Sequence, residues 1–296
     1  MDPAHRRKGL GGKRNIACSL STPQDRRSRT IDAMSQSGIS TLIPRPLKIM
    51  LLLAAMAHPI AVKAKDVELS WEKGTAFIPG GLFPRSPKNI SLDGKRPVLI
   101  YLHGCTGITH NHDTLWAQEI AKLGFVVVMP DSFARPGRVP DCDPSRKRRS
   151  NAFPKAHQYR QEEITYSLEQ VRRAAWADQR NIFLMGHSEG GQATARSRHD
   201  AWNAQVISGW TCTFEGRPES AGIHSPKHIP ALAVAYLDDP WRTAGPTRGR
   251  CVDQAGDRKV EQVDLPGSGH GTFHEDAARE AVFRFLKANL RPLGAK

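Results

Sequence analysis

The sequence predicts an α/β fold with a mostly parallel central sheet and helices on both faces. Short apolar runs alternate along the chain with segments that have the length and apolar periodicity of helices. Most of these runs are apolar throughout, which is typical of strands buried on both faces. Several of them lead into polar or glycine-rich loops, and such loops would meet at the carboxyl edge of a parallel sheet. The pattern therefore favours a helix-covered parallel sheet.

The expected elements follow this alternation from residue 66 onward. Residues 66–71 alternate at period two and residues 75–78 could pair with them, so we expect an opening β-hairpin. The predicted buried strands are 97–102, 125–129, 181–185, 205–208, 231–237 and 260–265. The predicted helices are 115–123, 159–176, 190–199 and a last helix whose start is set by a capping box of Thr272 and Glu275.

The most informative stretch is 181–193, where an apolar run leads into Gly186-His187-Ser188-Glu189-Gly190. This is the pattern G-x-S-x-G between a predicted strand and a predicted helix, the context that a nucleophile elbow requires. Such a sharp turn strains the central residue, and glycines beside it let the strand and the helix approach closely. We therefore expect Ser188 to be a nucleophile that stands above the sheet edge, at a helix N-terminus.

A serine nucleophile needs a base to take its proton and an acid to orient that base. In chain order, Asp238 follows the predicted strand 231–237, and His270 lies in a glycine-flanked loop after strand 260–265. Nucleophile, acid and base thus occur in the order typical of α/β-hydrolases. Asp239 is the alternative acid, and we favour Asp238 because Pro240 restricts the backbone of Asp239. His274 is the alternative base, but the capping box would place it in a helical turn.

The loop 103–107 follows the first buried strand and contains glycine. In an α/β-hydrolase the corresponding loop supplies one backbone N–H of the oxyanion hole, and the residue after the nucleophile supplies the other. These would be the N–H groups of Cys105 and Glu189, and neither side chain is needed for that role. His103 is expected to order the loop by hydrogen bonding.

Residues 97–290 resemble the dienelactone hydrolase family of α/β-hydrolases. The resemblance rests on five segments: Leu102-His-Gly-Cys-Thr-Gly107, Met129-Pro-Asp-Ser-Phe133, Met185-Gly-His-Ser-Glu-Gly-Gly191, Leu237-Asp-Asp-Pro-Trp241 and Gly269-His-Gly271. It implies hydrolysis of an ester or lactone. Because the family's namesake has a cysteine nucleophile where this chain has Ser188, general ester hydrolysis is favoured over dienelactone.

The first 64 residues predict an N-terminal extension and export signal, and residues 65–296 the α/β-hydrolase domain. An apolar run at 49–62 follows Lys48 and ends in Val62-Lys-Ala64, which is typical of a signal peptide cleaved after Ala64. Residues 1–33 are rich in arginine and precede Met34, the start we favour. The formal charge of +14 resides largely in this front end: residues 1–64 carry +8 and residues 65–296 carry +6. We therefore expect a periplasmic or secreted protein without stable membrane insertion, and no nucleic-acid partner.

Four of the five cysteines lie in the predicted mature chain, which suits an oxidising compartment. We favour a Cys212–Cys251 disulfide, with Cys105–Cys142 as a second pairing, while four free thiols remain open because sequence alone does not fix connectivity. No cofactor or metal is expected, since His110-Asn-His112-Asp113 has no spaced further ligand. The alternatives to a small-molecule ester or lactone hydrolase are a serine peptidase on short peptides and a catalytically silent binding protein of the same fold.

Overall fold

A computed structural model describes residues 66–140, 142, 153–214, 218–243 and 249–292. The described residues all belong to one compact unit. The expected export signal, the start at Met34 and the domain boundary at 64/65 lie outside the described residues. Among the described residues, no helix is long and apolar enough to cross a membrane.

Seven strands form one sheet in the order β1-β3-β2-β4-β5-β6-β7. All neighbours are parallel except β1 and β3, which are antiparallel. The predicted mostly parallel sheet is confirmed, with each predicted buried strand present to within a few residues of its expected ends. The strands are β1 (Thr75–Phe77), β2 (Arg96–Leu102), β3 (Val126–Met129), β4 (Ala177–His187), β5 (Gln205–Ser208), β6 (Ala231–Tyr236) and β7 (Val260–Leu265).

The predicted opening hairpin is wrong. Residues 66–72 are helical, and β1 pairs with β3 instead of with them. Val67, Ser70 and Trp71 are all buried, and their spacing of three and four residues places them on one face of a helix. Over so short a segment, period-two alternation and helical spacing share several positions, so the pattern did not distinguish a strand from a helix.

The helices are α2 (Asp113–Lys122), α3 (Phe153–Arg173), α4 (Glu189–Arg196), α5 (Pro240–Thr243) and α6 (Asp276–Ala288). Short 3₁₀ helices are η1 (Pro87–Asn89), η2 (Ser132–Ala134), η4 (Pro218–Ser220) and η5 (Cys251–Gln254). The expected capping box is wrong: α6 begins after Glu275, which makes no side-chain cap bond. Instead, Glu275 accepts a hydrogen bond from the Tyr236 hydroxyl, and Thr272 bonds Ser208, so both side chains are used by tertiary contacts.

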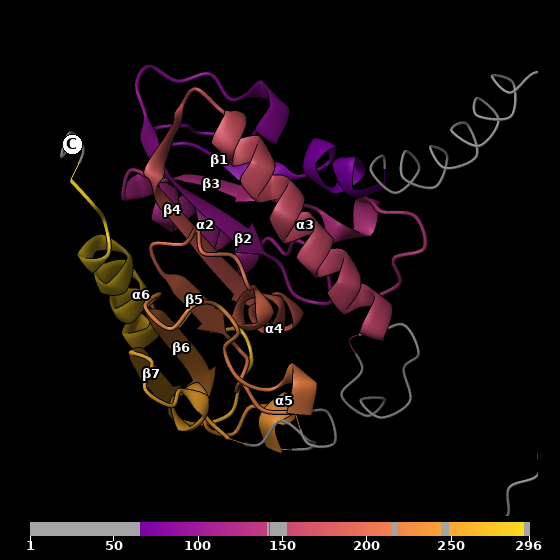
Figure 1. Cartoon of the computed structure of the whole chain (residues 1–296), viewed down its shortest axis with the longest axis vertical. Coiled ribbons are helices and arrows are strands. Elements are labelled where there is room, and N and C mark those ends of the chain that lie inside the picture. The colour runs from indigo at the N-terminus through magenta and orange to yellow at the C-terminus, as the bar shows by residue number, and fades with distance from the viewer. Residues whose placement is uncertain (1–65, 141, 143–152, 215–217, 244–248, 293–296) are drawn as a thin grey trace, which may run out of the picture. The chain divides into compact units, whose positions relative to one another are not determined.

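The two faces of the sheet bury separate apolar cores. On β2, Leu99 and Tyr101 pack with residues of α2 and α6, such as Trp116 and Phe285. The alternate residues of the same strand pack with the stripe on α3 that the sequence predicts, including Ile164, Leu168 and Val171. In Figure 1, α3 crosses the sheet on the viewer's side. Helices on both faces leave the carboxyl edge of the parallel strands as the place where the loops gather.

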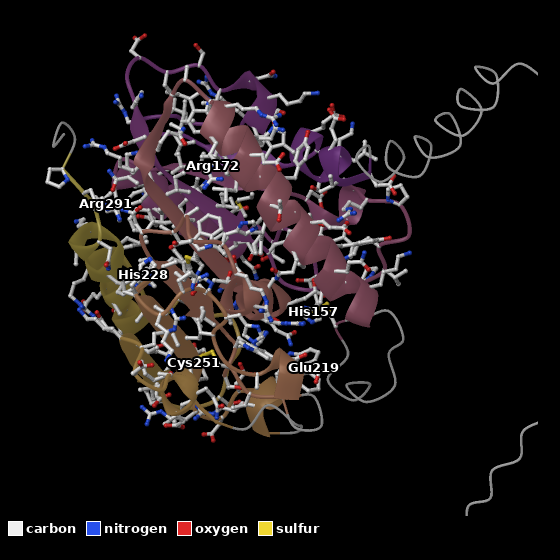
Figure 2. All side chains as sticks on the ribbon, in the orientation of Figure 1. His157, Arg172, Glu219, His228, Cys251 and Arg291 are labelled. Atoms are coloured by element: carbon white, nitrogen blue, oxygen red, sulfur yellow. A yellow bond between two sulfur atoms is a disulfide. The ribbon has the colours of Figure 1, made fainter. Side chains whose placement is uncertain are left out.

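Both expected disulfides are present, Cys105–Cys142 and Cys212–Cys251. Cys251, labelled in Figure 2, lies in η5 and is fully buried with Cys212 in a third apolar cluster, against Ile207 and Trp210. The bond therefore joins the loop after β5 to the segment before β7.

Replacing Cys212 and Cys251 together by serine should lower the free energy of unfolding by about 4 kcal/mol, because the loop-entropy model assigns roughly that value to a loop of this length. Urea unfolding of the double variant measures the loss. The Cys105→Ser, Cys142→Ser double variant opens a loop of similar length, with a sequence separation of 37, and should lose a similar amount by the same model. A Cys212/Cys251 variant as stable as the wild type would contradict the expectation.

Candidate active site

Ser188 occupies the turn between β4 and α4, as the sequence predicts. Its backbone angles are φ 57° and ψ −116°, a left-handed φ that non-glycine residues rarely adopt. The Ser188 N–H donates to the carbonyl of Ser208 on neighbouring β5, at 2.8 Å. Such strain persists only where the surrounding structure imposes it, and it is common at active sites. Ser188 thus has the backbone geometry of a nucleophile elbow.

Glycines around Ser188 permit the close approach of strand and helix. A Cβ atom on Gly190 would lie 2.0 Å from the Leu102 carbonyl oxygen of β2, and one on Gly186 would lie 2.2 Å from the Gly190 oxygen. Both distances are far below van der Waals contact, so no other residue fits without moving the backbone. The prediction that these positions require glycine is confirmed.

His270 pairs with Asp239. The expectation that Asp238 is the carboxylate in contact with His270 is therefore wrong. The Nδ1 of His270 lies 2.7 Å from Asp239 Oδ2. Asp239 is 2% exposed, whereas Asp238 is exposed to solvent. The restriction imposed by Pro240 was expected to disfavour Asp239 as the acid, but it favours Asp239. A proline that opens a helix favours an extended residue before it, and Asp239 then caps α5 by accepting from the Trp241 N–H at 2.8 Å.

The other ring nitrogen of His270, Nε2, is buried and has no hydrogen-bond partner within the described part of the chain. The centroid of the His270 ring lies 4.8 Å from the ring centroid of His187, the residue before Ser188. The His270 ring also lies close to Gly209. The residue before Gly209 is Ser208, whose carbonyl accepts the Ser188 N–H. The structure therefore brings His270 to the elbow without a hydrogen bond to Ser188. Catalytic hydrogen bonds are often long in unliganded enzymes.

His274, the alternative base, lies away from this arrangement. Its Nε2 is 2.9 Å from the carbonyl oxygen of Asn111, and the side chain is exposed. His112 and His187 form a contact that the sequence did not indicate, with ring centroids 4.0 Å apart. Burial first, and then the nearby His112 and His270, hold the pKa of His187 well below its ordinary value. His187 is therefore a neutral, buried neighbour of His270.

The loop after β2 passes directly over Ser188. A Cβ on Gly104 would lie 3.4 Å from the Ser188 Cβ, which puts the backbone of the next residue, Cys105, beside the elbow. Glu189 is the first residue of α4, so its N–H has no partner within the helix. Both expected oxyanion-hole positions thus lie beside Ser188. Cys105 is also held by its disulfide to Cys142.

The side chain of Glu189 takes part in a buried ionic cluster that sequence reasoning missed. Its Oε1 accepts from Arg138 and, at 2.9 Å, from the Nε of Arg160. Burial alone would raise the pKa of Glu189, but Arg160 and Arg138 lower it to about 2. His157, labelled on α3 in Figure 2, is buried close enough to this carboxylate to affect its pKa. The residues come from distant segments, so no sequence motif marks them.

His103 orders its loop, as expected. Its Nε2 accepts the N–H of Ser132 at 3.0 Å, so Nδ1 carries the proton and donates to the carbonyl of Gly104 at 2.7 Å. Burial first, and then the positive charge of Arg160, lower the pKa of His103 to about 3. The imidazole is therefore neutral at physiological pH.

In the segment His110-Asn-His112-Asp113, both His112 and Asp113 accept hydrogen bonds from within the protein. Asp113 accepts from the Tyr101 hydroxyl at 2.9 Å and from Thr109, and His112 Nε2 accepts from the Thr272 N–H. Their lone pairs are thus committed to protein donors. Within the described residues, no group of three or more His, Cys, Asp or Glu side chains could hold a metal ion.

The parallel sheet, the strained serine at the end of β4 and the His270–Asp239 pair define an α/β-hydrolase fold. The dienelactone hydrolase family matches residues 84–213, which confirms the resemblance to this family over that part of the chain. No curated protein sequence matches significantly. The match to this family supports the assignment of hydrolase activity to the protein.

Similar solved structures share the fold at low identity. The structure of ferulic acid bound to Est1E from Butyrivibrio proteoclasticus is 15% identical, with 73% of this chain and 94% of that chain covered and a TM-score of 0.51. An acetyl xylan esterase from Paenibacillus sp. R4 is 16% identical, with 73% and 79% covered and a TM-score of 0.50.

The neutral His103 should make stability sensitive to acid. Its folded pKa of about 3 lies below the ordinary 6.5, so between these values the unfolded state binds one more proton. Stability contributed by His103 is complete above about pH 6.5 and falls as the pH drops toward 3, by about 1.4 kcal/mol per pH unit. Urea unfolding between pH 4 and 6 should show this slope reduced in His103→Asn. An unchanged slope would contradict the assignment.

Proposed function

We propose that the protein is a serine hydrolase that cleaves carboxylic ester or lactone bonds through Ser188, His270 and Asp239. The observation that carries the proposal is the strained Ser188 backbone, with the His270–Asp239 pair beside it, in which Asp239 is buried. Asp239 replaces Asp238 in the expected triad because it is the carboxylate that contacts His270. The match to the dienelactone hydrolase family supports the same chemistry.

The proposed reaction has two halves. Ser188 Oγ attacks the carbonyl carbon while His270 Nε2 takes the hydroxyl proton, and Asp239 stabilises the resulting imidazolium through Nδ1. The N–H groups of Cys105 and Glu189 stabilise the oxyanion of the tetrahedral intermediate. When this intermediate collapses, His270 gives its proton to the leaving alkoxide, and Ser188 is left acylated. Water, activated by His270, then attacks the acyl group and releases the acid and Ser188.

Peptide hydrolysis is the alternative reaction on the same residues, and a silent binding protein is the alternative of another class. We favour ester hydrolysis because the family match is to a lactone-cleaving family. The intact set of three side chains argues against a silent fold. We also propose export to the periplasm or beyond, supported by the two disulfides.

Ser188→Ala should abolish activity because no other group at the elbow can form the acyl-enzyme. Turnover of p-nitrophenyl butyrate should fall by several orders of magnitude, and a fluorophosphonate probe should label the wild type but not the variant. A panel of acetyl xylan, methyl ferulate, simple lactones and a peptide p-nitroanilide separates the substrate classes. Peptide cleavage without ester cleavage would favour the peptidase. A wild type that neither labels nor hydrolyses any of these would favour the binding protein.

The two adjacent aspartates provide a matched pair of variants. Asp239→Asn should lower kcat by about 10⁴-fold, because an amide cannot hold the imidazole in the required tautomer or stabilise its protonated form. Asp238→Asn should leave kcat within about twofold, since that carboxylate is exposed and does not contact His270. Steady-state kinetics on p-nitrophenyl butyrate measure both. A larger loss in Asp238→Asn than in Asp239→Asn would reverse the assignment.

A further inference from the structure

Arg160 is a fully buried arginine on α3 that contacts both the loop after β2 and the first residue of α4. It lies in the first half of α3. An arginine is rarely buried unless its charge is paired and its donors are satisfied. The groups that bond Arg160 must therefore pair its charge and accept its N–H groups.

One side of the Arg160 guanidinium holds the loop after β2. Its Nη2 donates to the carbonyl of His103 at 2.8 Å and lies 3.3 Å from the carbonyl of Gly104. These two carbonyls immediately precede Cys105, whose N–H is one of the two proposed oxyanion donors. The peptide that carries the Cys105 N–H also carries the Gly104 carbonyl. A contact to that carbonyl therefore restricts the direction in which the N–H points.

The other side of the same guanidinium holds the start of α4. Its Nε donates to Glu189 Oε1 at 2.9 Å, and both side chains are buried. Glu189 carries the second proposed oxyanion donor. Arg138 bonds the same carboxylate oxygen, so two arginines fix this side chain. A charge-assisted bond between buried groups is stronger and better defined than a neutral one.

A second carboxylate, that of Glu163, also pairs with the positive charge of Arg160. Glu163, one turn along α3, lies 3.4 Å from Arg160 Nη1 and accepts the hydroxyl of Ser132. Burial raises the pKa of Glu163, opposed mainly by Arg160. The planar guanidinium reaches the two carbonyls on one edge and the carboxylate on another, which a lysine ammonium at one point cannot do.

We propose that Arg160 is a positioning residue that sets the separation of the two oxyanion donors, by bonding the backbone before Cys105 and the side chain of Glu189. The inference rests on the proposed hydrolase function. Arg160 does not itself touch the substrate in this arrangement. Its effect on the reaction passes through the N–H groups of Cys105 and Glu189.

A misplaced oxyanion hole should impair the transition state more than substrate binding, because the oxyanion exists only after attack on the carbonyl. Arg160→Met should therefore lower kcat by about 10²-fold, with KM changed by less than about threefold. A trifluoromethyl ketone forms an oxyanion adduct with the serine. Its inhibition constant should rise in proportion to the loss of kcat/KM. Arg160→Lys should be intermediate and serves if the methionine variant fails to fold.

Arg258→Met is the matched control. Arg258 is also buried and also donates to backbone carbonyls, those of Pro226 and Ile229, but neither belongs to the loops beside Ser188. It should lower the melting temperature as Arg160→Met does, while kcat stays within about twofold of the wild type. Glu189→Gln keeps an acceptor for Arg160 Nε and should lose less kcat than Arg160→Met.

The outcomes separate this inference from the proposed function. If the wild type has Ser188-dependent activity and folded Arg160 variants keep kcat within about threefold, the positioning role is wrong and the hydrolase stands. Loss of kcat with unchanged affinity for the trifluoromethyl ketone would also overturn the role. An equal loss of kcat in Arg258→Met would assign the effect to general destabilisation. Absence of Ser188-dependent activity in the wild type would overturn both.

Discussion

The close approach of β2, β4 and α4 is the constraint on which the rest of the site depends. Gly190 lies against the carbonyl of Leu102, and Gly186 lies against Gly190, at distances that leave no room for a Cβ atom. With the helix pressed onto the strands in this way, the chain between them must turn within one residue. Ser188 takes a positive φ as a result. Backbone packing therefore fixes the position of the proposed nucleophile before any side-chain interaction is formed.

Around this turn, the structure separates two kinds of electrostatic environment. On one side, a neutral imidazole lies beside the proposed base: His187 contacts His270, and burial keeps His187 uncharged. On the other side, Glu189 remains ionised between two arginines. The proposed oxyanion forms between these two environments. A neutral region beside the base avoids a permanent like charge against the imidazolium, and a rigid ionic cluster limits movement of the donors.

Contacts from distant segments also explain where sequence reasoning failed. Both Asp238 and Asp239 follow the same strand, and only the turn into α5 decides which of them is buried against His270. Thr272 and Glu275 have the spacing of a capping box, but Ser208 and Tyr236 take their side chains. In each case a local rule was correct about the residue types, and a tertiary hydrogen bond determined their use.

The sequence by itself determined the parallel sheet, the position of Ser188 at a strand-to-helix turn, the need for glycine beside it and the histidine that approaches it. These features depend on apolar periodicity and on backbone geometry, which act over short stretches of chain. Only the tertiary structure decided the partner of His270 and the joining of His103, Arg160 and Glu189 in one buried cluster. Those contacts link segments tens of residues apart. Their geometry follows from how α3 and the loops pack over the sheet, and no local pattern encodes that packing.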